Sequence, residues 1–342
     1  MRHARRLLLH TLTSRPIARV WKPFMRGRAA VLVLHRLADP ELGTPGHDPE
    51  LLRRALAYLR RERYELLELR ELFRRLADGM PADRPAVAFT MDDGYLEQAG
   101  VAGDIFAAFD CPVTTFVTTG FLDGALWLWW DRISYVFAHT RRLAIELELE
   151  GTSLRYLRDP VAGHAEARRD FIARCKQVSD QAKLAGIECL ASAAEVEVPA
   201  RPPVRYMPMS WDQVHALESR GMSFAPHTVT HPILSRTSDE QSRREIAGSW
   251  ERLRACARSP VPIFCYPNGE AQDYGAREIN TLKALGLTGA VAGARGYAAA
   301  REFLRDPDGP LHVPRLAYHD DLRLLTQYVS GLERFKEILR GR

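Results

Sequence analysis

The chain has 342 residues, of which 46% are hydrophobic and 27% charged, a composition that supports a folded core and excludes a disordered chain. Its net charge of +5 is modest for this length, and no zinc-finger spacing or RNA-binding signature accompanies it, so we expect no nucleic-acid partner. Five cysteines without a C-x-x-C pair predict no disulfide framework and fit a reducing compartment.

Residues 1–28 form a basic amphipathic segment in which cations alternate with apolar side chains and no acid occurs. Such a segment could rest on an anionic membrane surface, and a solvated terminus is the alternative. The apolar run Leu7 to Leu9 is too short for a secretory signal, and no stretch reaches the ~18 apolar residues of a membrane span. We therefore expect a cytoplasmic protein, membrane-associated if this segment binds lipid.

Short apolar runs alternate with helical patterns along the rest of the chain. Helical periodicity is clear over Pro49 to Arg61 and Asp239 to Ala257. The runs read as strands are Ala29 to Leu34, Ala86 to Met91, Val113 to Val117, Met222 to Ala225, Ile263 to Tyr266, Gly289 to Ala292 and His312 to Leu316. Alternation predicts a parallel sheet, and nearly continuous apolar strands indicate an α/β barrel or a doubly wound sheet, of which we expect the barrel.

The alternation breaks between about residues 125 and 208. Leu143 to Leu149 alternates apolar and polar residues and predicts a strand, paired with Ser153 to Leu157 around a turn at Glu150-Gly151. A charged helical run follows. We predict an insertion at 125–208 within a single domain over 29–342.

Two adjacent carboxylates, Asp92 and Asp93, end one predicted strand, and Gly94 lets the backbone turn after them. Ligand sites of parallel α/β folds lie at such strand ends. On a bent backbone one carboxylate can bind a metal while the other faces a substrate. The alternative is a turn whose acids cap a helix.

A second strand is followed by His227 and His231, four residues apart. Two histidines and one carboxylate form a recurrent site for divalent metals with open coordination positions. An isolated surface pair of histidines would carry no function, but this pair follows a strand end as the carboxylates do.

The segments AFTMDDGY, SFAPHTVTH and FCYPNG resemble the successive motifs of the polysaccharide deacetylases, carbohydrate esterase family four, which share the NodB-homology fold. The resemblance spans Arg28 to about Gly124 and Met209 to about Leu316. It implies a distorted (β/α) barrel that removes acetyl groups from sugars.

The resemblance also implies roles for the motif residues. Asp92 would be the general base, and Asp93, His227 and His231 would hold a divalent metal, with zinc expected and cobalt or nickel as alternatives. The backbone N–H near Tyr266 would stabilise the oxyanion, with Asn268 at the same strand end.

Cleavage of an amide needs an acid for the departing amine. The candidate is His35, which closes the first strand and whose ordinary pKa lies near neutrality. Its alternative role is to cap that strand, and His312 and His319 are rival acids.

The third motif departs from the family pattern, because Cys265 stands where many members carry an arginine that orients the base. We predict that Arg315, in the last strand, supplies the guanidinium; an ordinary surface arginine is the alternative. A nucleophilic role for Cys265 is disfavoured because no base is identifiable beside it.

The predicted reaction is therefore removal of N-acetyl groups from an amino sugar in a polysaccharide, an oligosaccharide or a lipid-linked precursor. Alternatives are a cyclic-amide hydrolase of the same fold and a non-catalytic saccharide-binding subunit. Aromatic side chains that could stack on sugar rings, with Trp129 preferred, are Trp127, Trp129, Trp130 and Tyr274.

Overall fold

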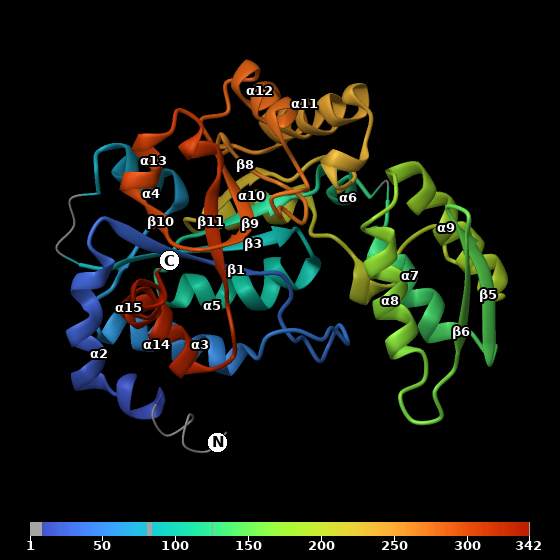
Figure 1. Ribbon diagram of the computed structural model, residues 1–342, viewed down its shortest axis with the longest axis horizontal. Coiled ribbons are helices and arrows are strands. Elements are labelled where there is room, and N and C mark those ends of the chain that lie inside the picture. The colour runs from blue at the N-terminus through green and yellow to red at the C-terminus, as the bar shows by residue number, and fades with distance from the viewer. Residues whose placement is uncertain (1–8, 81–83, 125, 342) are drawn as a thin grey trace.

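The sheet of this protein is nearly closed into a barrel, as the computed structural model shows for residues 9–80, 84–124 and 126–341 (Figure 1). Its nine strands are β1 (Arg28–Leu34), β2 (Glu65–Leu66), β3 (Ala86–Asp93), β4 (Val113–Val117), β7 (Ser223–Pro226), β8 (Ile263–Cys265), β9 (Gly289–Arg295), β10 (Ala298–Ala299) and β11 (Val313–Ala317). They follow the order β7-β4-β3-β1-β11-β9-β8, with every pair on this path parallel. The N–H of Val261 donates to the carbonyl of Phe224 on β7 at 2.8 Å, which brings the two end strands together. The predicted α/β barrel is confirmed.

Helices cover the outside of the barrel (Figure 1). The predicted helix over Pro49 to Arg61 is confirmed as α3; it begins where Asp48 accepts hydrogen bonds from the first-turn N–H groups, and it buries Leu52 and Leu56. The others are α4 (Leu69–Ala77), α5 (Gly103–Ala108), α6 (Thr119–Leu122), α10 (Trp211–Glu218), α11 (Asp239–Cys256), α12 (Ala276–Ala284), α13 (Ala300–Arg305) and α14 (Leu322–Ser330), with short turns at Gln98–Ala102, Val204–Tyr206, Leu234–Arg236 and Gly309–Leu311.

Successive side chains of the strands belong to different apolar clusters, because neighbours on a strand point to opposite faces of the sheet. Val31, Ala88 and Phe116 belong to one cluster, shared with the other barrel strands. Leu32 and Phe89 belong to a second cluster, which includes side chains of α3 and α5. The strands are therefore buried on both faces, which explains their continuous apolar sequence.

The segment predicted as an insertion forms a lobe beside the barrel (Figure 1). It contains α7 (Trp129–His139), β5 (Ala144–Leu149), β6 (Thr152–Leu157), α8 (Ala165–Cys175) and α9 (Asp180–Ala193). The predicted hairpin is confirmed as β5 and β6, which pair antiparallel around Glu150 and Gly151. The lobe has an apolar cluster of its own, centred on Ile133, Phe171 and Ile187. The boundaries at 125 and 208 stay a prediction.

The N-terminal segment packs on the barrel domain where it is described; residues 1–8 lie outside the described part. Its helix α2 (Arg15–Trp21) and the turn at Lys22–Met25 contact α15 (Leu332–Leu339). The Trp21 ring lies 5.0 Å from that of Phe335, and Arg15 and Arg19 pair with Glu62. No helix in the described ranges is long and apolar enough to cross a membrane. Membrane contact through this segment stays a prediction.

Candidate active site

The polar site lies at the carboxyl ends of three neighbouring strands. Asp93 on β3 is opposite Val117 on β4, and Val117 is opposite Pro226, the last residue of β7. This register brings Asp93 next to His227. Asp93 has a φ of 82°, a conformation that residues other than glycine rarely adopt. Gly94 follows at φ 93°, where an added Cβ would lie 2.6 Å from Leu122.

Three ligand atoms converge at this point. The Nε2 atoms of His227 and His231 lie 3.1 Å apart, and Asp93 Oδ1 lies 3.8 Å and 3.5 Å from them, respectively. Two ligand atoms of one tetrahedral zinc ion lie roughly 3.3 Å apart. Asp93 Oδ1 is buried and has no hydrogen-bond partner among the described residues. The donor set therefore fits a divalent metal ion.

The electrostatics of this set also fit a cation. The pKa of Asp93 is raised well above its ordinary value, mainly by burial and secondly by the negative charge of the neighbouring Asp92. Burial lowers the pKa of His227 to about 4, and burial together with the adjacent His227 lowers the pKa of His231 well below its ordinary value. Both imidazoles are therefore neutral at neutral pH, which is the form that binds a metal.

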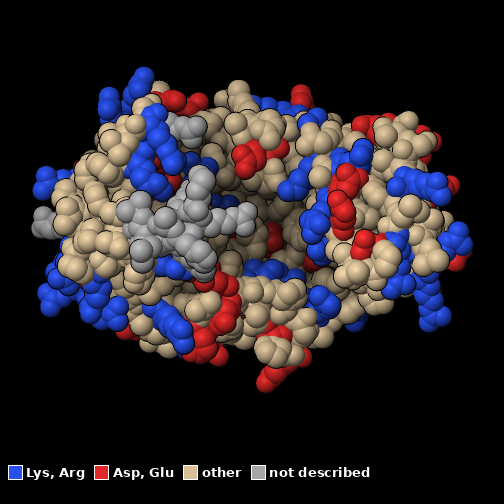
Figure 2. Space-filling view, turned by 60° about the horizontal axis from the view of Figure 1, so that its bottom comes forward, with Lys and Arg blue, Asp and Glu red and all other residues tan. Residues whose placement is uncertain are grey.

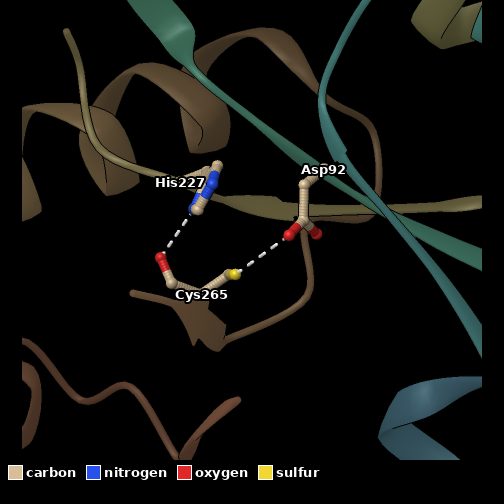
Figure 3. Close-up of side chains that lie close together, drawn as sticks. All are labelled: Asp92, His227 and Cys265. Atoms are coloured by element: carbon tan, nitrogen blue, oxygen red, sulfur yellow. Dashed lines mark hydrogen bonds between the residues drawn. The ribbon is translucent and has the colours of Figure 1, made fainter. Parts of the chain in front are cut away.

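Hydrogen bonds to the backbone fix His227. Its Nδ1 lies 2.7 Å from the carbonyl of Cys265 on β8 (Figure 3). A carbonyl only accepts, so Nδ1 carries the proton and the Nε2 lone pair is available. Such an outer contact sets the orientation of a metal-binding histidine.

Glu245 of α11 holds the turn between the two histidines. Its Oε2 accepts from the N–H groups of Val229 and Thr230, both at 2.8 Å, and its Oε1 accepts from Thr230 Oγ1 at 2.6 Å. The N–H of His231 donates to Thr228 Oγ1 at 3.0 Å. Thr228 and His231 have φ values of 67° and 59°, so these contacts stabilise a turn that L-residues rarely form.

Asp92 forms a bidentate ion pair with Arg315 of β11. The guanidinium Nη1 and Nη2 lie 2.7 Å and 2.8 Å from Asp92 Oδ1 and Oδ2. Burial alone would raise the pKa of Asp92, but the Arg315 guanidinium more than offsets this and holds the pKa below its ordinary value. Asp92 is therefore ionised at neutral pH.

Cys265 lies beside this pair, with its Sγ 3.7 Å from Asp92 Oδ2 (Figure 3). The same Sγ lies 3.2 Å from Arg315 Nη2. Burial raises the pKa of the thiol well above its ordinary value, which makes it inert as a nucleophile. Asp92, His227 and Cys265 also lie close enough to share a metal ion. A cation there would meet the buried guanidinium of Arg315, so the set with Asp93 is the better site.

One pocket of about 440 Å³ is lined by both aspartates, both histidines and Arg315. His35 and Asn268 line the same pocket. His35 Nε2 lies 3.7 Å from Asp92 Oδ2, and 58% of its side chain is exposed. The rival His312 contacts Tyr274 instead, and His319 is exposed outside the pocket lining. The structure thus brings His35, and neither rival, to the site.

Comparison with known proteins shows one family model and several solved structures that this chain resembles. The polysaccharide deacetylase family model matches residues 189–290, which include His227 and His231. The Streptococcus pyogenes deacetylase PplD, solved in complex with acetate, is similar with a TM-score of 0.57 and 18% identity over 88% of this chain and 98% of its own. A de-N-acetylase from Aggregatibacter actinomycetemcomitans has a TM-score of 0.52 and 15% identity over 90% and 99%.

BC0361, a polysaccharide deacetylase from Bacillus cereus, has a TM-score of 0.53 and 16% identity over 89% of this chain and 69% of its own. At such identities the likeness shows the fold. No curated protein shows significant sequence similarity to the chain. The resemblance to the polysaccharide deacetylases is confirmed.

The oxyanion donor expected near Tyr266 stays a prediction. The N–H of Tyr266 itself donates to the carbonyl of Val291 on β9 at 3.3 Å. The Tyr266 ring is buried against Tyr274, with centroids 3.7 Å apart, and neither residue lines the pocket. Asn268, at the same strand end, does line it.

Of the aromatic side chains singled out for sugar stacking, Trp129 and Trp130 line the pocket and Trp127 and Tyr274 do not. The Trp130 ring lies 4.6 Å from that of His231, and its Nε1 donates to Tyr95 at 2.9 Å. Sequence reasoning missed Glu245 and Lys176. The only signal for Glu245 was an acid beside the buried Ile246, and nothing distinguished Lys176 among surface cations.

Proposed function

We propose that this chain hydrolyses the N-acetyl group of an amino sugar, in a polysaccharide, an oligosaccharide or a lipid-linked precursor, with one divalent metal ion. The observation that carries the proposal is the convergence of Asp93, His227 and His231 beside the ionised pair of Asp92 and Arg315. The polysaccharide deacetylase model and the similar fold of the Aggregatibacter de-N-acetylase support the same reaction. We expect zinc, with cobalt or nickel as alternatives. A cytoplasmic location stays a prediction.

The proposed reaction divides its work between the two aspartates. A divalent ion held by Asp93, His227 and His231 would supply polarisation of the acetyl carbonyl and a more acidic water. Asp92, ionised and fixed by Arg315, accepts the proton of the water that attacks the acetyl carbon. The bidentate contact keeps the carboxylate in one orientation, so no reorganisation is needed when the proton moves.

His35 is the acid in this proposal. Its imidazole lies on the pocket side of Asp92, with Nε2 3.7 Å from Oδ2. Protonated His35 would donate to the nitrogen of the departing amine, which completes the cleavage of the C–N bond and leaves acetate and a free amino sugar. Desolvation lowers the pKa of the imidazole below its ordinary value although Asp92 acts in the opposite direction, so His35 takes up the proton that it donates from solvent, through the exposed part of its side chain.

Acetate release tests the proposal. We would incubate zinc-loaded protein, chelated protein and the His35→Gln variant with an N-acetylglucosamine tetramer and with a lipid-linked acetamido sugar. We expect acetate and free amine in equal amounts from the zinc-loaded protein alone. Binding of either saccharide without release of acetate would support a saccharide-binding subunit. Hydrolysis of a cyclic amide, offered as an alternative substrate, without hydrolysis of either saccharide would support a cyclic-amide hydrolase.

A further inference from the structure

The lining of the active-site pocket contains one cation that no carboxylate neutralises. Arg315 pairs with Asp92, and Arg36 pairs with Glu97. Lys176 also lines the pocket, but within the described ranges no acid lies within ion-pair distance of its ammonium group. Among the described residues its ammonium group donates to a neutral amide oxygen, that of Asn268.

The lobe, rather than the barrel, supplies this cation. Lys176 directly follows α8, and Ile172, one helical turn earlier, lines the same pocket. Figure 2 shows that the molecule is hollowed between the body at the left and the lobe at the right, with Lys or Arg side chains on the right-hand rim. The lobe thus contributes a half-buried ammonium group to the wall of the pocket.

The position of the ammonium group is fixed by Asn268. Lys176 Nζ donates to Asn268 Oδ1 at 2.7 Å, and Asn268 Nδ2 donates to Asp273. Because Asp273 accepts, the amide can present only its oxygen to Lys176. An ammonium group has three N–H donors, so at least one remains for a ligand.

We infer that Lys176 binds an anionic group of the substrate, a phosphate or a carboxylate carried on or next to the acetylated sugar. The inference rests on the proposed function. Among the described residues Lys176 has a neutral amide as its partner, in a wall partly removed from water. An ammonium group in this position makes charge-assisted hydrogen bonds to such an oxygen anion. Lys176 is therefore a specificity-determining residue that favours anionic over neutral saccharides.

The test compares three acetylated disaccharides that differ in one substituent: neutral, phosphorylated at the reducing end, and with a uronic acid as the second sugar. We would measure kcat/KM for wild type, Lys176→Gln and Lys176→Glu. Gln retains a donor for Asn268 but no charge. The matched control is Arg174→Gln, which removes a cation from the exposed side of the same helix. Dissociation constants would be measured on proteins that also carry His35→Gln, which slows consumption of the ligand and leaves the ion pair of Asp92 and Arg315 intact.

We expect the kcat/KM of wild type to be about tenfold or more higher for at least one anionic disaccharide than for the neutral one. The disaccharide that is preferred shows whether Lys176 binds a phosphate or a carboxylate. Lys176→Gln should remove that preference, Lys176→Glu should reverse it, and Arg174→Gln should retain it. Equal losses on all three disaccharides would overturn the inference, because they would mean that Lys176 only ties the lobe to the barrel.

Absence of any acetate release would overturn the proposed function, and the dissociation constants would still decide on Lys176. Tighter binding of an anionic disaccharide that disappears in Lys176→Gln would support the inference. Identical constants for the neutral and anionic disaccharides in the His35→Gln protein that retains Lys176 would overturn it.

Discussion

Arg315 and Asp92 face each other from strands β11 and β3 as a buried bidentate ion pair, with N–O distances of 2.7 Å and 2.8 Å. The Sγ of Cys265 lies 3.2 Å from the same guanidinium. A guanidinium therefore contacts the carboxylate proposed as the base, even though Cys265 stands at the third-motif position where many members of the family carry an arginine. The pair needs both partners, because a single buried charge is strongly destabilising.

Replacing Arg315 by Met should therefore lower both stability and activity. We expect the free energy of unfolding to fall by roughly 3–5 kcal/mol, since Asp92 would remain buried without its partner. The pKa of Asp92 would rise, and kcat would fall at neutral pH. Chemical denaturation and acetate release measure the two effects, with the exposed Arg301→Met as the control.

The double variant Cys265→Arg with Arg315→Met tests whether the guanidinium can come from the third motif. Cys265 lies beside both Asp92 and Arg315, so an arginine there should regain part of the lost kcat. Activity no higher than that of Arg315→Met would show that a guanidinium on β8 cannot replace the one on β11.

His231→Ala should abolish metal binding at the proposed centre. Only two of the three proposed protein ligands, Asp93 and His227, would remain, which is too few for a stable zinc site. Metal content after dialysis against zinc should fall from about one ion per chain to background. His10→Ala, at an exposed position in the N-terminal segment, is the control and should bind as wild type does.

Glu245→Gln should weaken metal binding without touching a ligand. The amide replaces one acceptor oxygen by a donor, so at least one of the three hydrogen bonds to the turn at Val229 and Thr230 is lost. We expect zinc affinity to fall about 10-fold to 100-fold, the range for outer-shell partners. Unchanged affinity in a competition titration would mean that the turn holds its shape without Glu245.

Asp131 should make stability depend on pH. Burial raises its pKa to about 6, although Tyr95 donates to it at 2.7 Å. The folded state therefore binds a proton more tightly than the unfolded state, whose carboxyl pKa is about 3.9. Its contribution to stability is greatest at low pH and falls as pH rises from about 4 to 6, by roughly 3 kcal/mol.

Asp131→Asn should remove this fall, so the difference in unfolding free energy between wild type and variant should change between pH 4.5 and 7. Asp170 provides the opposite case in the lobe, because Arg174 and Tyr156 hold its pKa below the ordinary value despite partial burial. Asp170→Asn should cost more stability at neutral pH than at low pH. A pH-independent difference for Asp131→Asn would contradict the raised pKa.

The parts of the site that follow strand ends could be predicted from the sequence. Asp92, Asp93 and His227 directly follow apolar runs, and parallel strands bring such positions to one edge of the sheet. Arg315 could be predicted because the third motif lacked a cation and β11 offered one.

The rest depended on contacts that no local pattern indicates. The N–H of Tyr266 is used by its pairing with Val291, which requires the register of β9. Lys176 reaches Asn268 across 92 positions of sequence, so only the packing of the lobe on the barrel brings it to the pocket. The buried Asp131 likewise acquires its environment from Tyr95, on a different element.

The most direct test of the central claim is acetate release by Asp92→Asn at matched zinc content. The variant keeps the shape of the side chain and leaves Asp93, His227 and His231 in place. Because it also leaves Arg315 without its ionic partner, rates are compared only between folded proteins of equal zinc content. We predict that wild type releases acetate from an N-acetylglucosamine tetramer and that the zinc-loaded variant is slower by at least about 100-fold. Equal rates at equal zinc content would contradict the role of Asp92 as the base.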